Sequence, residues 1–119
     1  MIGTPSTYSP SKSLHGRVAI KKGEYWLAEY INKTLVASLR VEKYGDTYVI
    51  REVMVDPEHR GTGLGRKIMT EIIAFLKPKG KDILLYVDPL NVIAKKLYTS
   101  LGFKLIKKGT RFGDKYQLE

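Results

Sequence analysis

The sequence predicts one α/β domain built on a mixed, mostly antiparallel sheet that contains a central parallel βαβ unit. Three observations predict this class. Short segments rich in β-branched and aromatic residues, separated by glycine or asparagine turns, fill the first half of the chain. The apolar period then changes to that of a helix, and a short apolar run separates two helical segments. A length of 119 residues suits a single domain with one modest core.

Four strands are expected before the first helix. Turn signals at Gly23, Asn32 and Gly45 separate them. The last of the four carries apolar side chains at both Val49 and Ile50, which point to opposite faces, so we expect a central strand that is covered on both sides. The predicted strands cover residues 17–20, 25–30, 35–41 and 47–55.

Two helices follow these strands. Apolar residues recur at helical spacing from Leu64 onward, and Pro78 ends that helix. A second helix is expected over 89–101, with Gly102 at the position of a C-cap glycine. Its apolar stripe is predicted to contain Ile93, Leu97 and Leu101, with Ala94 and Tyr98 beside it.

The apolar run 83–87 between the two helices predicts a buried strand. The segment 47–87 is therefore a βαβ unit, whose two strands are expected to be parallel and joined by a right-handed crossover. After the second helix, 103–107 and 115–118 are expected to close the sheet as a hairpin.

Composition narrows the classes of function. Without cysteine the chain has neither a disulfide nor a thiol nucleophile, and no ligand spacing around His15 or His59 indicates a metal site. Because no long apolar run and no signal pattern occur, we expect a cytoplasmic protein without membrane association. Residues 1–13, rich in Ser, Thr and Pro, predict a flexible N-terminal tail before a domain over 14–119.

A formal net charge of +9 predicts attraction to anions. Nucleic acid, an acidic protein surface and a phosphorylated cofactor all fit, and charge alone does not choose among them. The C-terminal half is strongly basic, and Tyr86, Phe103 and Phe112 are aromatic side chains on which bases could stack. No recognisable nucleic-acid-binding signature accompanies them, so a basic nucleic-acid-binding or protein-binding module is the alternative rather than the favoured interpretation.

A glycine-rich loop between a strand and a helix is the most informative stretch. Alternating glycines allow close approach of a ligand to the main chain, and the unpaired N–H groups of a helix N-terminus favour an anion. The stretch therefore predicts a pyrophosphate cradle that two arginines reinforce. It reads Arg60-Gly61-Thr62-Gly63-Leu64-Gly65-Arg66.

Known phosphate loops differ in how well they fit this stretch. The patterns G-x-x-x-x-G-K-[ST] and G-x-G-x-x-G both fail here. The pattern [R/Q]-x-x-G-x-[G/A] is satisfied by Arg60, Gly63 and Gly65, and it resembles the coenzyme A loop of the GNAT N-acetyltransferase superfamily. The segment from Asn91 to Phe103 is similar to that family's N-x-x-A-x-x-L-Y-x-x-x-G-F, and 53–57 looks like its strand end.

This resemblance implies a GNAT-like acyl-CoA N-acyltransferase fold and direct transfer of an acetyl group from acetyl-CoA to a primary amine. The two parallel strands would splay apart to hold the pantetheine arm, through main-chain groups of Val53 and Val55. The loop 60–66 would hold the pyrophosphate, and Asn91 would bond the cofactor, unless it serves only as a helix cap. No metal is implied.

The resemblance also implies catalytic roles. Tyr98 matches a tyrosine that protonates the departing thiolate, or else it only packs in the core. Glu52 stands beside Val53, where a carboxylate could take the proton of the amine; the alternative is a paired surface glutamate. His59 is expected to contact the cofactor or solvent, and His15 to be incidental.

One departure from the family pattern concerns the acceptor. The two helices that the family places between its first and second strands are missing here, since only four residues lie between Ile20 and Tyr25. We expect an open acceptor cleft, suited to a protein lysine or N-terminus or walled by a homodimer partner; a small-molecule amine stays open as well. A fold that binds acyl-CoA without catalysis is the second alternative.

Overall fold

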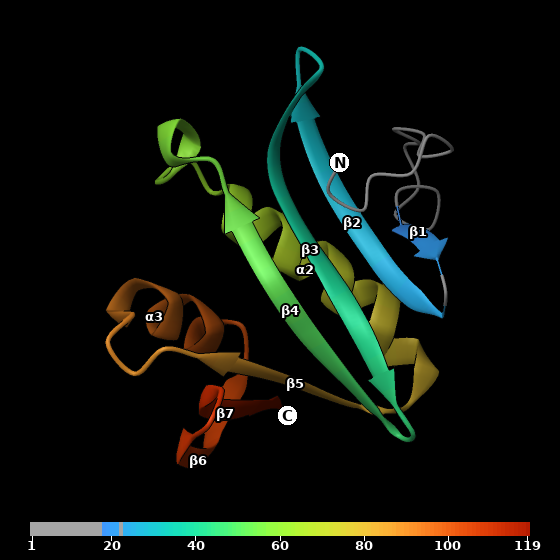
Figure 1. Ribbon diagram of the computed structural model, residues 1–119, viewed down its shortest axis with the longest axis vertical. Helices are drawn as coiled ribbons and strands as arrows, with labels where there is room; N and C mark the ends of the chain where they lie inside the picture. The colour runs from blue at the N-terminus through green and yellow to red at the C-terminus, as the bar shows by residue number, and fades with distance from the viewer. Residues whose placement is uncertain (1–17, 22) are drawn as a thin grey trace.

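A computed structural model describes residues 18–21 and 23–119 and shows a seven-stranded sheet in the order β1-β2-β3-β4-β5-β7-β6 (Figure 1). Neighbouring strands are antiparallel except β4 and β5, which are parallel. The predicted mixed sheet with a central βαβ unit is therefore confirmed. The predicted tail and His15 lie outside the described residues.

The element bounds follow the predicted ones closely. Three hairpin strands, β3, β6 and β7, run further than predicted, because β3 pairs with β4 up to Tyr44 with Thr47, and β6 pairs with β7 up to Thr110 with Gly113. β2 is longer by one residue at each end. The strands are β1 (Val18–Lys21), β2 (Glu24–Ile31), β3 (Thr34–Tyr44), β4 (Thr47–Val55), β5 (Asp82–Val87), β6 (Phe103–Thr110) and β7 (Gly113–Leu118). The helices are α2 (Leu64–Leu76) and α3 (Val92–Ser100), with the short 3-10 turns η1 (Pro57–His59) and η2 (Lys77–Lys79).

The core lies between the sheet and α2, which crosses one face of β2, β3 and β4 (Figure 1). Alternation along each strand sends every second side chain to this face. Burial of such side chains contributes roughly 1.5–3 kcal/mol each and is the main stabilising term. The helix buries Ile68, Met69, Ile72, Phe75 and Leu76 against strand residues that include Leu27, Leu39, Ile50 and Leu85.

The apolar stripe of α3 differs from the predicted one. Ile93 is 85% exposed, whereas Tyr98, placed beside the stripe, is the buried residue of this helix. The cause is that nothing covers the first turn, since Leu90 and Val92 are exposed too. Gly102 follows the helix with φ +103°, which confirms its C-terminal position.

The structure bears on two further expectations, the missing helices after the first strand and the aromatic stacking surfaces. Only residues 22 and 23 lie between β1 and β2, so the missing helices are confirmed for this connection. Phe103 is 1% exposed and offers no stacking surface for a base, which corrects that part of the nucleic-acid interpretation. None of the described helices has the length and apolar character needed to span a membrane.

The β6–β7 hairpin is fixed to the rest of the domain by Asp114. Its carboxylate accepts a hydrogen bond of 2.9 Å from the Gly109 N–H and lies 3.1 Å from the ammonium of Lys95 on α3. The Gly109 bond, opposed by burial and aided by Lys95, lowers the pKa of Asp114. The neighbouring Gly113 lets β7 approach the end of β5 closely, because an added Cβ would lie 2.6 Å from the Val87 carbonyl oxygen.

Gly113→Ala is expected to lower the free energy of unfolding by roughly 2–5 kcal/mol, since the methyl group meets the Val87 carbonyl and φ is +108°. Gly109→Ala is the matched control: φ is +66° and nothing lies within 4 Å, so the loss is limited to about 1–2 kcal/mol. Urea unfolding of both variants measures the difference, and equal losses would contradict the close approach.

Candidate functional site

The two parallel strands separate at their carboxyl ends. Four residue pairs join them, from Thr47 with Asp82 to Ile50 with Leu85, and no residue of β4 after Ile50 has a partner in β5. Figure 1 shows the two strands diverging toward their arrowheads. Because the carboxyl ends of parallel strands are where ligands bind in such sheets, the gap is the natural place for a site. The splay that the family resemblance implies is thus present.

The divergence has a local cause in β4. Arg40 of β3 pairs with Arg51, but Ser38 pairs with Met54, so β4 contains one extra residue here. Glu52 takes up this bulge with φ +54°, an uncommon value for a residue other than glycine. A bulge bends its strand, and here it turns the end of β4 away from β5. The expected burial of both faces of β4 accordingly holds for Val49 and Ile50 but not beyond them.

The loop after β4 presents a row of unpaired main-chain donors. Within the described part of the chain, the N–H groups from Gly61 to Arg66 make no hydrogen bond. Gly61 and Gly63 have φ of +80° and +86°, and a Cβ added at either would meet nothing within 4 Å. Alternating left-handed residues before a helix turn successive N–H groups toward one concavity, which suits an anion. This geometry fits the predicted pyrophosphate cradle.

Side chains of the loop hold its shape. Nδ1 of His59 lies 2.8 Å from the Asp56 carboxylate, and the Thr62 hydroxyl donates to the His59 carbonyl. Nε of Arg60 donates to the Val55 carbonyl at 3.4 Å. His59 thus supports the loop from within. The expectation that it contacts the cofactor or solvent stays a prediction.

The start of α2 is packed between β4 and α3. Arg66 donates to the Ser100 hydroxyl at 2.8 Å. A Cβ on Gly65 would lie 3.5 Å from Leu97 and 3.7 Å from Val55. The cradle is therefore fixed relative to both sides of the gap.

A cavity of about 650 Å³ lies at the splayed ends of β4 and β5, and residues of both strands, of β3 and of α3 line it. Its walls contain four of the predicted site residues, Glu52, Val53, Asn91 and Tyr98, whereas Val55 and the loop 60–66 lie outside it. Tyr86 and Phe112, singled out above only as side chains on which bases could stack, line it as well. Other wall residues were not singled out from the sequence, among them Arg40, Glu42, Arg51 and Asp88.

Tyr98 forms part of the wall from α3. The residue is 8% exposed, and its ring meets Phe103 edge-on with the ring centroids 6.1 Å apart. Burial raises the pKa of the Tyr98 phenol above its ordinary value. The phenol therefore stays protonated at neutral pH, as a proton donor requires.

Asn91 is the N-cap of α3, because its side-chain oxygen accepts a 3.1 Å hydrogen bond from the Ala94 N–H. The amide nitrogen of the same side chain makes no bond within the described residues, and Asn91 is one of the residues that line the cavity. The helix-cap alternative is thus observed, and a contact with a cofactor through the amide nitrogen stays a prediction.

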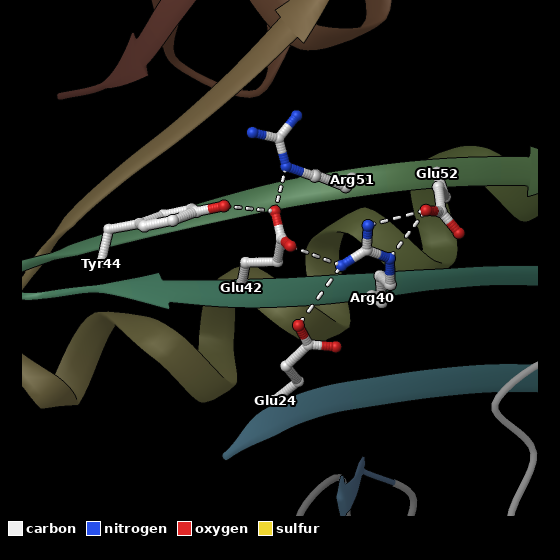
Figure 2. Close-up of polar contacts among 6 residues, drawn as sticks. All are labelled: Glu24, Arg40, Glu42, Tyr44, Arg51 and Glu52. Carbon is white, nitrogen blue, oxygen red and sulfur yellow. Dashed lines mark hydrogen bonds and ion pairs between the residues drawn. The ribbon is translucent and has the colours of Figure 1, made fainter. Parts of the chain in front are cut away.

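An ionic network covers the face of the sheet opposite α2 (Figure 2). Arg40 is at its centre: Nε and Nη2 both lie 2.8 Å from Oε2 of Glu52, and Nη1 lies 2.9 Å from Glu42 and 3.5 Å from Glu24. The hydrogen bond with Glu52, only partly offset by desolvation, raises the pKa of Arg40. Glu52 is therefore ion-paired, as the alternative of a paired surface glutamate states. Its second carboxylate oxygen, Oε1, has no partner among the described residues.

Glu42 connects the two arginines of the network. It accepts hydrogen bonds from Arg51 Nε and, at 3.0 Å, from the Tyr44 hydroxyl, besides its ion pair with Arg40. Partial burial alone would raise the pKa of Glu42, but these donors outweigh it and lower the pKa. A signal that could have found this cluster is the spacing of Arg40 and Glu42, two residues apart, but the predicted strand ended at residue 41 and so did not include Glu42.

No group of three or more His, Asp or Glu side chains gathers as a metal site among the described residues.

Glu42→Gln is expected to lower the free energy of unfolding by about 1 kcal/mol at neutral pH, because a charged acceptor of several donors is lost. The folded-state pKa of Glu42 is lowered, so its contribution is present above the unfolded pKa and lost as the pH falls through the folded value. Denaturant titrations of both proteins from neutral to acid pH should therefore converge. A constant difference would show that the charge of Glu42 is not the cause.

Known proteins resemble this chain in sequence and in fold. The model of the acetyltransferase (GNAT) family matches residues 4–103. Mycothiol acetyltransferase of Thermobispora bispora is 50% identical over 60 residues, which is 50% of this chain and 19% of that protein. The corresponding protein of Thermobifida fusca is 40% identical over 73 residues, 60% of this chain and 22% of its own length. This chain thus spans about a fifth of the length of these relatives.

Two solved structures share the fold. Escherichia coli ElaA superimposes with a TM-score of 0.73 at 20% identity, covering 83% of this chain and 70% of its own. PaiA N-acetyltransferase of Thermoplasma acidophilum, solved in complex with coenzyme A, gives 0.72 at 18% identity, with 81% and 60% covered. The family match over residues 4–103 and this shared fold, with its splayed strands and glycine loop, lead to one conclusion: the chain belongs to the acetyltransferase (GNAT) family.

Proposed function

We propose that this chain transfers the acetyl group of acetyl-CoA directly to a primary amine. The observation that carries the proposal is the cavity at the splayed ends of β4 and β5, which Glu52, Val53 and Tyr98 line together. Groups that could polarise a carbonyl and move protons thus meet in one space. Membership of the acetyltransferase family supports the same reaction.

The glycine loop would hold the pyrophosphate of the acetyl donor. Its free N–H groups are fixed before the ligand arrives, so little conformational freedom is lost on binding. They belong to Gly61, Thr62, Gly63, Leu64, Gly65 and Arg66. Arg60 and Arg66 add positive charge at the two ends of this row. Beyond the loop, main-chain groups of Val53 and Val55, which have no partner in β5, and the amide nitrogen of Asn91 would hold the arm that leads to the thioester.

The chemistry needs a polarised carbonyl and a neutral amine. An N–H of β4 at Val53, left without a partner in β5, would donate to the acetyl oxygen as negative charge develops there. The amine nitrogen forms the new C–N bond, the C–S bond of the thioester breaks, and the amine releases one proton. Much of the rate would come from holding both substrates together. With no cysteine in the chain, no cysteine-linked acyl-enzyme forms.

Tyr98 would supply the proton that the departing thiolate takes up. Its phenol lies in the cavity wall and is protonated at neutral pH, because burial raises its pKa. The phenolic oxygen can therefore donate as the C–S bond breaks.

Tyr98→Phe is expected to lower kcat at least a hundredfold, the lower end of the usual contribution of a general acid, while the affinity for acetyl-CoA is unchanged. Phenylalanine keeps the ring contact with Phe103, so the fold is retained. Calorimetric titration of both proteins with acetyl-CoA, with ATP as the control nucleotide, measures binding, and release of the coenzyme A thiol measures turnover.

Several outcomes of that experiment are informative. A wild-type protein that binds acetyl-CoA no better than ATP would overturn the proposed function. Binding without turnover on any amine would instead favour a fold that binds acyl-CoA without catalysis. Unchanged turnover in the variant would remove Tyr98 from the mechanism and leave the reaction itself intact.

Glu52 would take the proton of the amine, directly or through water. Arg40 binds one of its carboxylate oxygens, and the other is free to face the cavity. The bulge that places Glu52 also places Val53, so base and carbonyl donor are adjacent on one stretch of β4.

Glu52→Gln is expected to lower kcat/KM roughly a hundredfold at neutral pH, where most of the amine is protonated in solution. Activity of the variant should recover as the pH approaches the pKa of the amine, because a neutral amine no longer needs the carboxylate. The measurement is the pH profile of kcat/KM for both proteins. Parallel profiles would show that Glu52 has only its structural role in the ion pair with Arg40.

A further inference from the structure

Two arginines face each other on neighbouring strands of the ionic network. Arg40 of β3 and Arg51 of β4 are direct register partners, an arrangement in which like charges repel. The guanidinium of Arg40 binds three carboxylates. Arg51 donates only through Nε, to Glu42, and Figure 2 shows its two terminal nitrogens pointing away from the network. Within the described residues those two nitrogens have no partner.

Aromatic rings hold this guanidinium in place. Its central carbon lies 5.6 Å from the centroid of the Tyr86 ring and 5.4 Å from that of Phe112. The two rings meet edge-on with their centroids 5.6 Å apart. An arginine anchored through Nε and flanked by two rings loses little freedom when its outer edge binds a ligand.

The free edge belongs to the acceptor side of the cavity. Arg51, Tyr86 and Phe112 all line it. Along β5 the neighbours of Tyr86, Leu85 and Val87, belong to the core under α2, so Tyr86 projects from the opposite face. The glycine loop begins α2 and does not line the cavity. The phosphates of the acetyl donor thus have their own site, and Arg51 is available to the second substrate.

We infer that Arg51 binds a carboxylate of the acceptor, so that the acetylated amine belongs to an amino acid or an acidic peptide. Two adjacent N–H donors in one plane match the two oxygens of a carboxylate. Glu52 and Asp88 line the same cavity and offer negative charge to the amine itself. A cavity with both signs suits a ligand that carries both, and its volume of about 650 Å³ is that of a small-ligand site.

This inference rests on the proposed acetyl transfer and names its substrate class. The test compares matched acceptors under saturating acetyl-CoA: the common amino acids with their α-amides, and short peptides with glutamate or glutamine at the second position. Tyramine and simple diamines serve as amines without a carboxylate. Loss of transfer on α-amidation assigns the carboxylate to the amino acid backbone, and loss with the glutamine peptide assigns it to an acidic side chain.

Arg51→Gln should reduce the ratio of kcat/KM for the carboxylate-bearing acceptor to kcat/KM for its neutral counterpart roughly ten- to hundredfold. Arg51→Lys, which keeps the charge but not the paired donors, should fall between. Arg111→Gln is the matched control, because Arg111 also lies over Phe112, at 5.2 Å, but does not line the cavity. Thermal unfolding of each variant confirms that the fold is retained.

The failures of the two proposals are distinguishable. Absence of acetyl-CoA binding by calorimetry overturns the proposed function. If acetyl-CoA binds, three results overturn the assignment of Arg51 alone. Neutral amines are acetylated as well as their carboxylate-bearing counterparts, no carboxylate-bearing amine is acetylated, or the preference for the carboxylate survives Arg51→Gln.

Discussion

The parallel pairing of β4 and β5 stops after four residue pairs, and the rest of the site depends on this limit. The α2 crossover brings the two strands together at their amino ends. The bulge at Glu52 then turns β4 aside, while β5 continues and pairs on its other edge with β7. Main chain that a continuous sheet would use for its own hydrogen bonds is thereby left for a ligand. Unpaired buried groups are costly, which is why such a gap is a place where a substrate binds well.

The ionic network explains how the bulge is tolerated. A glutamate with positive φ is strained, and such residues persist only where their surroundings hold them. Arg40 grips the Glu52 carboxylate through two nitrogens, and Glu24 and Glu42 fix Arg40 in turn. The face of the sheet opposite α2 is thus charged, whereas a face that packs against a helix is apolar. The charged face can meet a polar substrate directly.

The end of β5 is fixed by the β6–β7 hairpin. Gly113 allows β7 to approach Val87, and Asp114 ties that hairpin to Lys95 on α3. Because α3 also carries Tyr98 and Asn91, the same contacts set both the width of the gap and the side chains that line it. Packing of Leu97 near Gly65 joins α3 to the start of the glycine loop. The glycine loop and the cavity wall on α3 are therefore connected by direct packing.

Local patterns in the sequence determined the order of the elements, the glycine loop and the placement of Tyr98, because turn residues, apolar period and motif spacing act over a few residues. The stripe of α3 was only partly predictable, since Ile93 fits the helical period but no element lies opposite it. The tertiary structure alone decided that Arg40, Glu42 and Arg51 line one cavity with Tyr98. That grouping follows first from the register of β3 and β4, which the extra residue at Glu52 shifts by one. It follows also from the packing of these strands near α3, which is far from them along the chain.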